Sequence, residues 1–502
     1  MSNATATAAA PEQRTLLGHP LGLYVLFFTE MWERFSFYSM KGILVLFMVK
    51  AMQYDDKLSN GVYGAYLGFV YSAPFLGGMI ADRLLGQRRA IVWGGILMAI
   101  AHFTLAANAL ALKYGYSLDV FSPLFYLGLG FLAAGNGFFK PNISTIVGSL
   151  YEQGDARRDG AFTIFYMGIN VGATLASISC QIAETYDWYI GFLLAGCGML
   201  VGQAIFALGK KWLQGKGMPP RPADAGQPAT GVASKTAGLL AAVLAFVPLA
   251  AFAMSRPQRV QDIAVYIAVP ILVYLVYEAM RGQPEERGRM IVIIVLSTFS
   301  MLFWGFFELA GSALNIFADR HVHRLISIGS WTWEAKASFL TSSINPILVI
   351  LLGYPFAKLW VWLDRVGKEP SSPLKFAFGL IQLAAGFLVL YAGAAQAGTD
   401  GRCNLSWLIL GFFLFTTGEL CLSPVGLSTI TKLSPARLVG MFMGVWFLAS
   451  ALGGVFAGKV GGYAADYGFA LVFRNIAIAT AAASVLLFIL VPFLKRLMYG
   501  VK

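Results

Sequence analysis

The chain has little charge and few of the residues that build sites in soluble proteins. Of its 502 residues, 12% are charged and four are histidine, whereas a soluble protein of this size carries about 25% charged residues. Its four cysteines have no metal-site spacing, and a disulfide framework is not expected from them. The sequence contains no cluster of metal ligands, nucleophile elbow or nucleotide-binding fingerprint. We therefore predict no enzyme, no metal and no cofactor.

Hydrophobic residues, by contrast, make up 58% of the chain, and the mean hydropathy is +0.68. Long apolar runs recur along the whole length, which predicts an all-α polytopic membrane protein in contact with the lipid bilayer. The net charge of +12 fits Lys and Arg kept on the cytoplasmic side better than it fits nucleic-acid binding. Residues 1–20 lack a basic region followed by an apolar core, so we expect a short cytoplasmic tail and no signal peptide.

The apolar runs predict fourteen membrane spans. With the N-terminus inside, most Lys and Arg fall in inside segments, which predicts cytoplasmic termini in a bacterial inner membrane. The predicted spans are 22–49, 60–83, 88–113, 121–147, 161–184, 189–213, 234–255, 260–280, 289–315, 336–362, 374–396, 405–431, 438–463 and 470–497.

Two inside loops repeat a short pattern. "GGMIADRLLGQRRA" (77–90) and "WLDRVGKEPSSP" (362–373) each contain Asp-Arg at equivalent positions once the two helices between 234 and 280 are set aside. This echo predicts two six-helix halves related by a repeat. The expected organisation is a tail at 1–20, a bundle at 21–213, a linker with two accessory helices at 214–285 and a second bundle at 286–502.

The first of these loops resembles the loop signature of the major facilitator superfamily. That resemblance implies that Asp82, Arg83 and Arg88 hold an inside gate. The simpler alternative is a positively charged inside loop at the end of a helix.

The first span carries charges where lipid would exclude them. Within "FFTEMWERFSFYSMKG" (27–42), Glu30, Glu33, Arg34 and Lys41 share one face of a helix, although each central charge costs about 2.5–3.5 kcal/mol to insert. Further polar residues in apolar surroundings are Lys140, Asn170, Glu308, Asn345 and Glu419. Ion pairs that only join helices are the simpler alternative, but buried pairs stabilise little. Intramembrane charges more often line a transport path.

Several spaced motifs resemble the signatures of the proton-dependent oligopeptide transporter family. They are Glu30-x-x-Glu33-Arg34-Phe35, "FYMGINVG" (165–172) and "GELCLSPVG" (418–426), in the order that the family shows. The resemblance implies a major facilitator fold with the two accessory helices of bacterial members. It also implies uptake of di- and tripeptides driven by the proton gradient, in a protein that we expect to work as a monomer.

The residues agree with a peptide site. A short peptide is a zwitterion whose ends are separated by about 3.5 Å per residue, so its site needs cations facing anions. We predict that Lys41 and Lys140 hold the carboxylate, and that Glu419, helped by Asn170 and Asn345, holds the amine. Aromatic walls and one hydroxyl complete the predicted site: Tyr38, Tyr71, Tyr166, Trp304, Trp446 and Ser423.

Proton coupling needs a carboxylate that changes partner as the gates move. Glu30 and Glu33 beside Arg34 form one candidate set, and Glu308 in the second half is another. The histidines are poorly placed for this role, because they lie in the tail, in an outside loop or alone in an apolar helix.

One departure from the family pattern concerns substrate recognition. Where the family usually has Tyr-Tyr-Gly followed by arginine, this chain has Phe37-Tyr38-Ser39-Met40-Lys41. Lysine keeps the charge but lacks the bidentate fork that matches a carboxylate. A transporter of the same fold for another small charged solute (nitrate, an amino-acid derivative or a drug) is the alternative. Glu419 argues against a purely anionic substrate.

Overall fold

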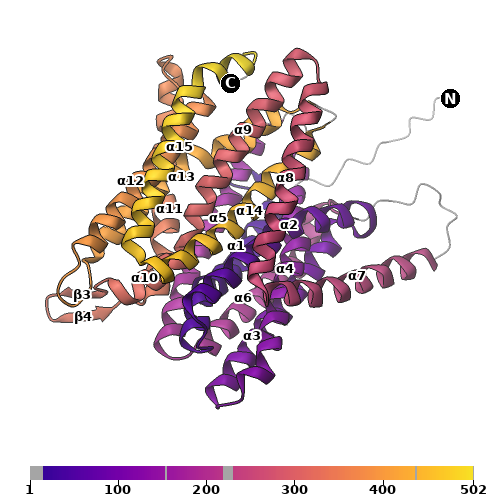
Figure 1. Ribbon diagram of the computed structural model, residues 1–502. Helices are drawn as coiled ribbons and strands as arrows, with labels where there is room; N and C mark the ends of the chain where they lie inside the picture. Colours follow the sequence, from indigo (N-terminus) through magenta and orange to yellow (C-terminus); the bar gives the residue numbers. More distant parts are fainter. Residues whose placement is uncertain (1–14, 153–154, 156, 219–229, 436–437, 501–502) are drawn as a thin grey trace, which may run out of the picture.

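The computed structural model describes residues 15–152, 155, 157–218, 230–435 and 438–500, which form a bundle of long helices (Figure 1). The first half contains α1 (Leu21–Lys50), α2 (Asp56–Ile80), α3 (Gln87–Lys113), α4 (Leu118–Ser149), α5 (Arg157–Thr185) and α6 (Trp188–Gly209). Then follow α7 (Thr230–Met254) and α8 (Pro257–Arg281). The second half contains α9 (Pro284–Phe307), α10 (Ala313–His321), α11 (Ala337–Arg365), α12 (Ser372–Ala395), α13 (Leu405–Leu433), α14 (Val439–Tyr467) and α15 (Phe469–Leu497).

Since α9 and α10 make up one interrupted span, the helices form two six-span bundles with two additional helices, as predicted. Within the described residues, 11 spans are long and apolar enough to cross a membrane. The charged helix α1 is not among them. Its crossing depends on how its charged side chains are paired, because lipid cannot solvate them.

The bundle has two ends, the terminal end and the hairpin end. The terminal end is where α1 begins and α15 ends, and there the Tyr499 hydroxyl donates to the carbonyl oxygen of Pro284. The hairpin end carries a two-stranded hairpin, β3 (Leu325–Ile328) with β4 (Trp331–Glu334), between α10 and α11. A second, shorter pairing of β1 (Thr15–Leu16) with β2 (His19–Pro20) leads into α1.

Aromatic side chains fill the interior of each half. In the first half, Phe47 contacts Phe125 and Phe192 with ring centroids 6.0 and 5.1 Å apart. In the second half, Phe387 contacts Phe415 at 4.8 Å and Phe473 at 6.0 Å. Such clusters give each half its own rigid core, so the halves can move as units.

The halves meet along two seams, where α2 packs against α14 and α5 against α11. On the first seam, a Cβ added at Gly64 would lie 2.7 Å from the Cα of Gly458, so this crossing requires glycine. On the second seam, the Sγ of Cys180 lies 4.0 Å from the Oγ of Ser342. Both atoms pack against Gly42 of α1, where a side chain would collide with them.

The two additional helices lie outside the bundles. Helix α7 packs against α4, and α8 contacts α2, α9 and α14. Figure 1 shows the start of α7 extending away from the rest of the molecule. Most of α8 is exposed, with 11% of its most apolar stretch buried. This exposure agrees with an accessory position next to lipid.

The predicted spans agree with the helices except at two places. The second span was expected to reach residue 83, but α2 ends at Ile80 and a π-helical turn covers Ala81–Leu85. The span expected at 289–315 is broken by a 3-10 turn at Glu308–Gly311 and continues to His321 as α10. At this break Gly311 lies against the Tyr63 hydroxyl, which leaves no room for a side chain.

Candidate functional site

The centre of α1 holds one arginine between two glutamates. The Nη2 of Arg34 donates to the Oε1 of Glu33 at 2.6 Å, and its Nε lies 3.3 Å from the Oε1 of Glu30. All three side chains are buried, and the Oε2 of Glu30 has no hydrogen-bond partner among the described residues. Two carboxylates thus share one cation. A proton on one of them would balance the charge.

A second ion pair joins the two halves. The Nζ of Lys41 on α1 lies 2.7 Å from the Oε2 of Glu308, the first residue of the break after α9. The Tyr71 hydroxyl donates to the Oε1 of Glu308 at 2.7 Å, and the Tyr63 hydroxyl donates to the Oε2 at 3.3 Å. Both oxygens of Glu308 are therefore bound, and all three partners belong to the first half.

The two lysines predicted to hold a carboxylate gather around Tyr71. The Nζ of Lys140 on α4 lies 5.5 Å from the centroid of the Tyr71 ring, whose hydroxyl binds the same glutamate as Lys41. Lys41 also lies over Tyr38, with its Nζ 5.6 Å from the ring centroid. Aromatic faces favour such cations when water is scarce. The structure thus brings Lys41, Lys140, Tyr38 and Tyr71 together.

The acidic side of the site belongs to the second half. The Nδ2 of Asn345 on α11 donates to the Oε2 of Glu419 at 2.8 Å and to the Oγ1 of Thr416 at 3.0 Å. Glu419 is 8% exposed, and Lys41 and Glu308 are close enough for their charges to act on it. The hydroxyl of Thr416 donates in turn to the carbonyl of Phe412. Asn345 is thereby oriented with its amide nitrogen towards the carboxylate.

The remaining predicted site residues take different positions. The Nδ2 of Asn170 donates to the backbone carbonyl of Tyr166 at 3.1 Å, so in this structure its side chain bonds within its own helix. Tyr166 is 39% exposed. Trp304 contacts two neighbouring phenylalanines of its own helix, and Trp446 packs on Phe376 with the ring centroids 6.4 Å apart. The side chain of Ser423 lies outside the described residues.

The predicted gate loop is bonded within itself and to the segment that follows α6. Asp82 accepts a hydrogen bond from the Nε2 of Gln87 at 3.1 Å. The Nε of Arg88 donates to the carbonyl of Lys216, in the segment that follows α6. The side chain of Arg83 lies outside the part of the chain that the structure describes. A gating role for this loop stays a prediction.

Sequence reasoning missed a set of ion pairs at the hairpin end. Lys50 at the end of α1 lies 2.7 Å from Asp319 of α10, and Arg320 lies 2.6 Å from Asp56 of α2. Glu184 at the end of α5 accepts a hydrogen bond from the hydroxyl of Ser338 on α11 at 2.7 Å. Each contact crosses between the halves. The sequence did contain a sign of these pairs. Opposite charges stand at the ends of spans that come to face each other when the two halves pair.

Towards the terminal end, α11 is packed less closely against neighbouring helices than at its start. Leu351 and Tyr354 are 63% and 68% exposed, whereas the start of α11 is held against α5 through Ser338 and Ser342. The structure therefore represents a conformation in which the halves are closed at the hairpin end.

Two helical halves that meet around buried, oppositely charged side chains define a membrane transporter of the major facilitator fold. The family model described as the POT family matches residues 88–469, and the chain belongs to this family. It is accordingly a transporter and not an enzyme.

Relatives of nearly equal length support this assignment. The chain is 35% identical to a peptide transporter of Yersinia enterocolitica, with 97% of both chains covered. It is 30% identical to dipeptide and tripeptide permease A of Serratia proteamaculans, with 99% of this chain and 96% of the relative covered.

Solved structures give the same result. A variant of a POT peptide transporter bound to alafosfalin is 33% identical, with a TM-score of 0.82 and coverage of 97% and 98%. A POT family transporter bound to 5-aminolevulinic acid is 27% identical, with a TM-score of 0.82 and coverage of 96% and 98%.

Proposed function

We propose that this chain is a proton-coupled symporter that imports di- and tripeptides by alternating access. The observation that carries the proposal is the division of charge in the centre. Lys41 and Lys140 belong to the first half, and the Asn345–Glu419 pair belongs to the second. A zwitterion that bridges the two sides draws the halves together, so that substrate binding drives closure.

The peptide carboxylate is bound by the lysines and the peptide amine by Glu419. Lys41 is already paired with Glu308, so an arriving carboxylate competes with Glu308 for the same ammonium group. Tyr38 and Trp446 offer amphipathic walls that tolerate varied side chains between the two charged ends.

Proton coupling uses the carboxylates that lose a partner during this exchange. Glu308 gives up Lys41 to the substrate, and the Glu30–Arg34–Glu33 group already has one carboxylate in excess of its cation. Within a low-dielectric centre, a carboxylate without a cation binds a proton more readily than one with a cation. Protonation and peptide binding thereby favour the same state.

The remaining features of the proposal concern orientation and assembly. The terminal end faces the cytoplasm of a bacterial inner membrane, because Lys and Arg concentrate in the segments at that end. Each half has its own aromatic core, which supports transport by a single chain. The helices α7 and α8 lie outside the charged centre, so we assign them no contact with substrate.

The test of polarity uses blocked dipeptides on purified protein. Acetylating the amine should weaken binding to the parent protein by about 2–5 kcal/mol, since Glu419 loses its charged partner. The same block should matter little after Glu419→Gln. Amidating the carboxylate should give the matching pattern with Lys140→Gln. Equal sensitivity of the parent and the Glu419→Gln protein to the blocked amine would contradict the proposed polarity.

A second substrate class is favoured by one observation. The structural relative bound to 5-aminolevulinic acid holds a compact solute with an amine and a carboxylate. Such an amino-acid derivative has the same two charges as a peptide without the peptide bond. Competition between labelled dialanine and 5-aminolevulinic acid in reconstituted vesicles distinguishes a strict peptide carrier from a broader one.

A further inference from the structure

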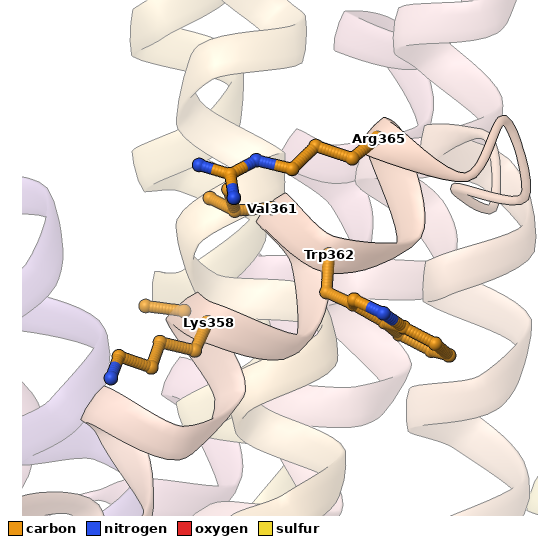
Figure 2. A pocket seen from close by; sticks show the side chains of 5 residues that line it. Lys358, Val361, Trp362 and Arg365 are labelled. Atoms are coloured by element: carbon orange, nitrogen blue, oxygen red, sulfur yellow. The ribbon is translucent and has the colours of Figure 1, made fainter.

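We propose that the terminal half of α11 carries a binding site for one anionic phospholipid. The site is a groove of about 410 Å³ lined by Ala357, Lys358, Val361, Trp362 and Arg365. In Figure 2, Lys358 and Arg365 extend to the same side of the helix. The proposal is independent of what the protein transports.

The terminal half of α11 is largely exposed. Of the most apolar stretch of α11, 11% is buried, compared with 56% for α12. The exposed apolar residues Leu351, Tyr354, Val361 and Trp362 are three, seven and one positions apart. Side chains with this spacing lie on one helix face. Asn345, which bonds Glu419, comes six residues before Leu351 in α11, so it is not part of this exposed stretch.

The groove is positively charged. The exposed face ends in Lys358 and Arg365, and the structure shows no acidic partner for either within the residues that it describes. The Nζ of Lys358 lies 4.6 Å from the centroid of the Tyr354 ring. Asp364 is next to Arg365 in the chain but about 100° away around the helix. The groove therefore presents two positive charges and no facing negative charge from its lining.

The residues of this part of α11 follow one another in an order that suits a phospholipid. Leu351 and Tyr354 come first and the cations follow, with Trp362 between the cations in the sequence. A phospholipid has the same order, with acyl chains towards the membrane centre and a phosphate at the surface. Tryptophan prefers the headgroup level, and basic side chains near the surface attract anionic lipids.

The spacing of the two cations suits a single phosphate. Lys358 and Arg365 are seven residues apart, which is about 10 Å along the helix axis. Both side chains are long and extend to the same side of α11 (Figure 2). The small side chain of Ala357 keeps the groove open beside them. Arginine can bind a phosphate with two parallel hydrogen bonds, and lysine adds a point charge.

The experiment measures lipid retained by the purified full-length protein in native mass spectrometry. Phosphatidylglycerol and phosphatidylcholine with identical acyl chains are titrated into the parent, K358Q/R365Q and the charge-preserving K358R/R365K. We expect the parent to prefer phosphatidylglycerol. K358Q/R365Q should bind it on the order of 30-fold more weakly, because each surface cation contributes about fivefold. K358R/R365K should bind it as the parent does.

A matched control removes two cations at the same end of the bundle. Lys495 and Arg496 are exposed in the last turn of α15, and K495Q/R496Q should leave phosphatidylglycerol binding unchanged. Equal loss in this control, equal binding of phosphatidylcholine by the parent, or full retention in K358Q/R365Q would overturn the proposal. Glycerol 3-phosphate that displaced the lipid mole for mole would also overturn it, since the groove would then bind a free anion.

Discussion

Charged contacts join the two halves both at the membrane centre and at the hairpin end, but in different surroundings. At the centre, Lys41 and Glu308 are 13% and 8% exposed and two tyrosine hydroxyls complete the contact. At the hairpin end, Lys57 and Asp466 pair at a similar distance while 57% and 38% exposed. Distance alone therefore does not rank these contacts. Burial decides which of these ion pairs need a substitute partner when they open.

The difference follows from solvation. An exposed pair that opens exchanges its partner for water, and such pairs contribute little to stability. A buried pair that opens leaves charges that lipid and protein cannot solvate, which costs about 3–5 kcal/mol when one partner is removed. The centre therefore requires a substitute partner, such as a proton or a charged substrate. The hairpin end only biases the balance between conformations.

The largest expected effect comes from the buried group on α1. Glu33→Gln or Glu30→Gln should abolish uptake driven by a pH gradient while peptide exchange across the membrane continues, because the exchange needs no net proton movement. Reconstituted vesicles with and without an imposed gradient measure both. Glu285→Gln, which removes an exposed carboxylate paired with Arg289, is the control. Driven uptake near the parent rate in both α1 variants would refute the coupling role.

The next effect concerns the pair between the halves. Lys41→Gln removes the ammonium from Glu308 and should destabilise the protein by about 3 kcal/mol, because the carboxylate stays buried. Lys41→Arg should retain stability and bind dipeptide at least as tightly, since its fork matches a carboxylate. Thermal unfolding and ligand titration check these outcomes. Similar melting temperatures for the glutamine and arginine variants would mean that this buried pair behaves as an exposed one.

A smaller effect is expected for the partly exposed contacts at the hairpin end. Removing the Lys50–Asp319 pair with Lys50→Gln should shift the balance towards the conformation open at this end by about 1 kcal/mol, or roughly fivefold. Labelling of a cysteine introduced at Ser342, in a protein whose native cysteines are replaced by serine, measures opening of the seam. The charge-preserving Lys50→Arg serves as control. Unchanged labelling of the glutamine variant would remove this pair from the closing contacts.

The smallest effect is expected for the most exposed pair. Lys57→Gln should leave the melting temperature and uptake unchanged within error at physiological salt, because water and ions replace Asp466. A clear loss of uptake would show that exposure does not predict how much these ion pairs contribute to transport.

Hydropathy predicted the helices well, because a membrane demands long apolar runs and tolerates few other structures. It could not predict the break at Glu308–Gly311. That break depends on the fit of Gly311 against Tyr63, a residue 248 positions away in the sequence. Hydropathy treats such a glycine as one more small residue in an apolar run.

The charged residues of the site were predictable because each is expensive in lipid. The hydroxyls of Tyr63 and Thr416 were missed, since such residues are common in membrane helices and give no signal until a carboxylate or amide is placed beside them. Asn170 was expected beside Glu419, but in the structure its side-chain amide donates a hydrogen bond to the carbonyl of Tyr166. A polar side chain on a helix can satisfy itself locally, and the sequence does not distinguish that choice.

The contact of Cys180 with Ser342 offers chemical control over the cycle. These side chains belong to opposite halves and lie 4.0 Å apart at the sulfur and oxygen atoms, on a seam that must part if the hairpin end opens. Ser342→Cys places a second thiol beside a native one. Oxidation would join the halves covalently, and a reducing agent would release them. A transporter that is halted and restarted by redox potential would let a single turnover be timed from a defined starting state.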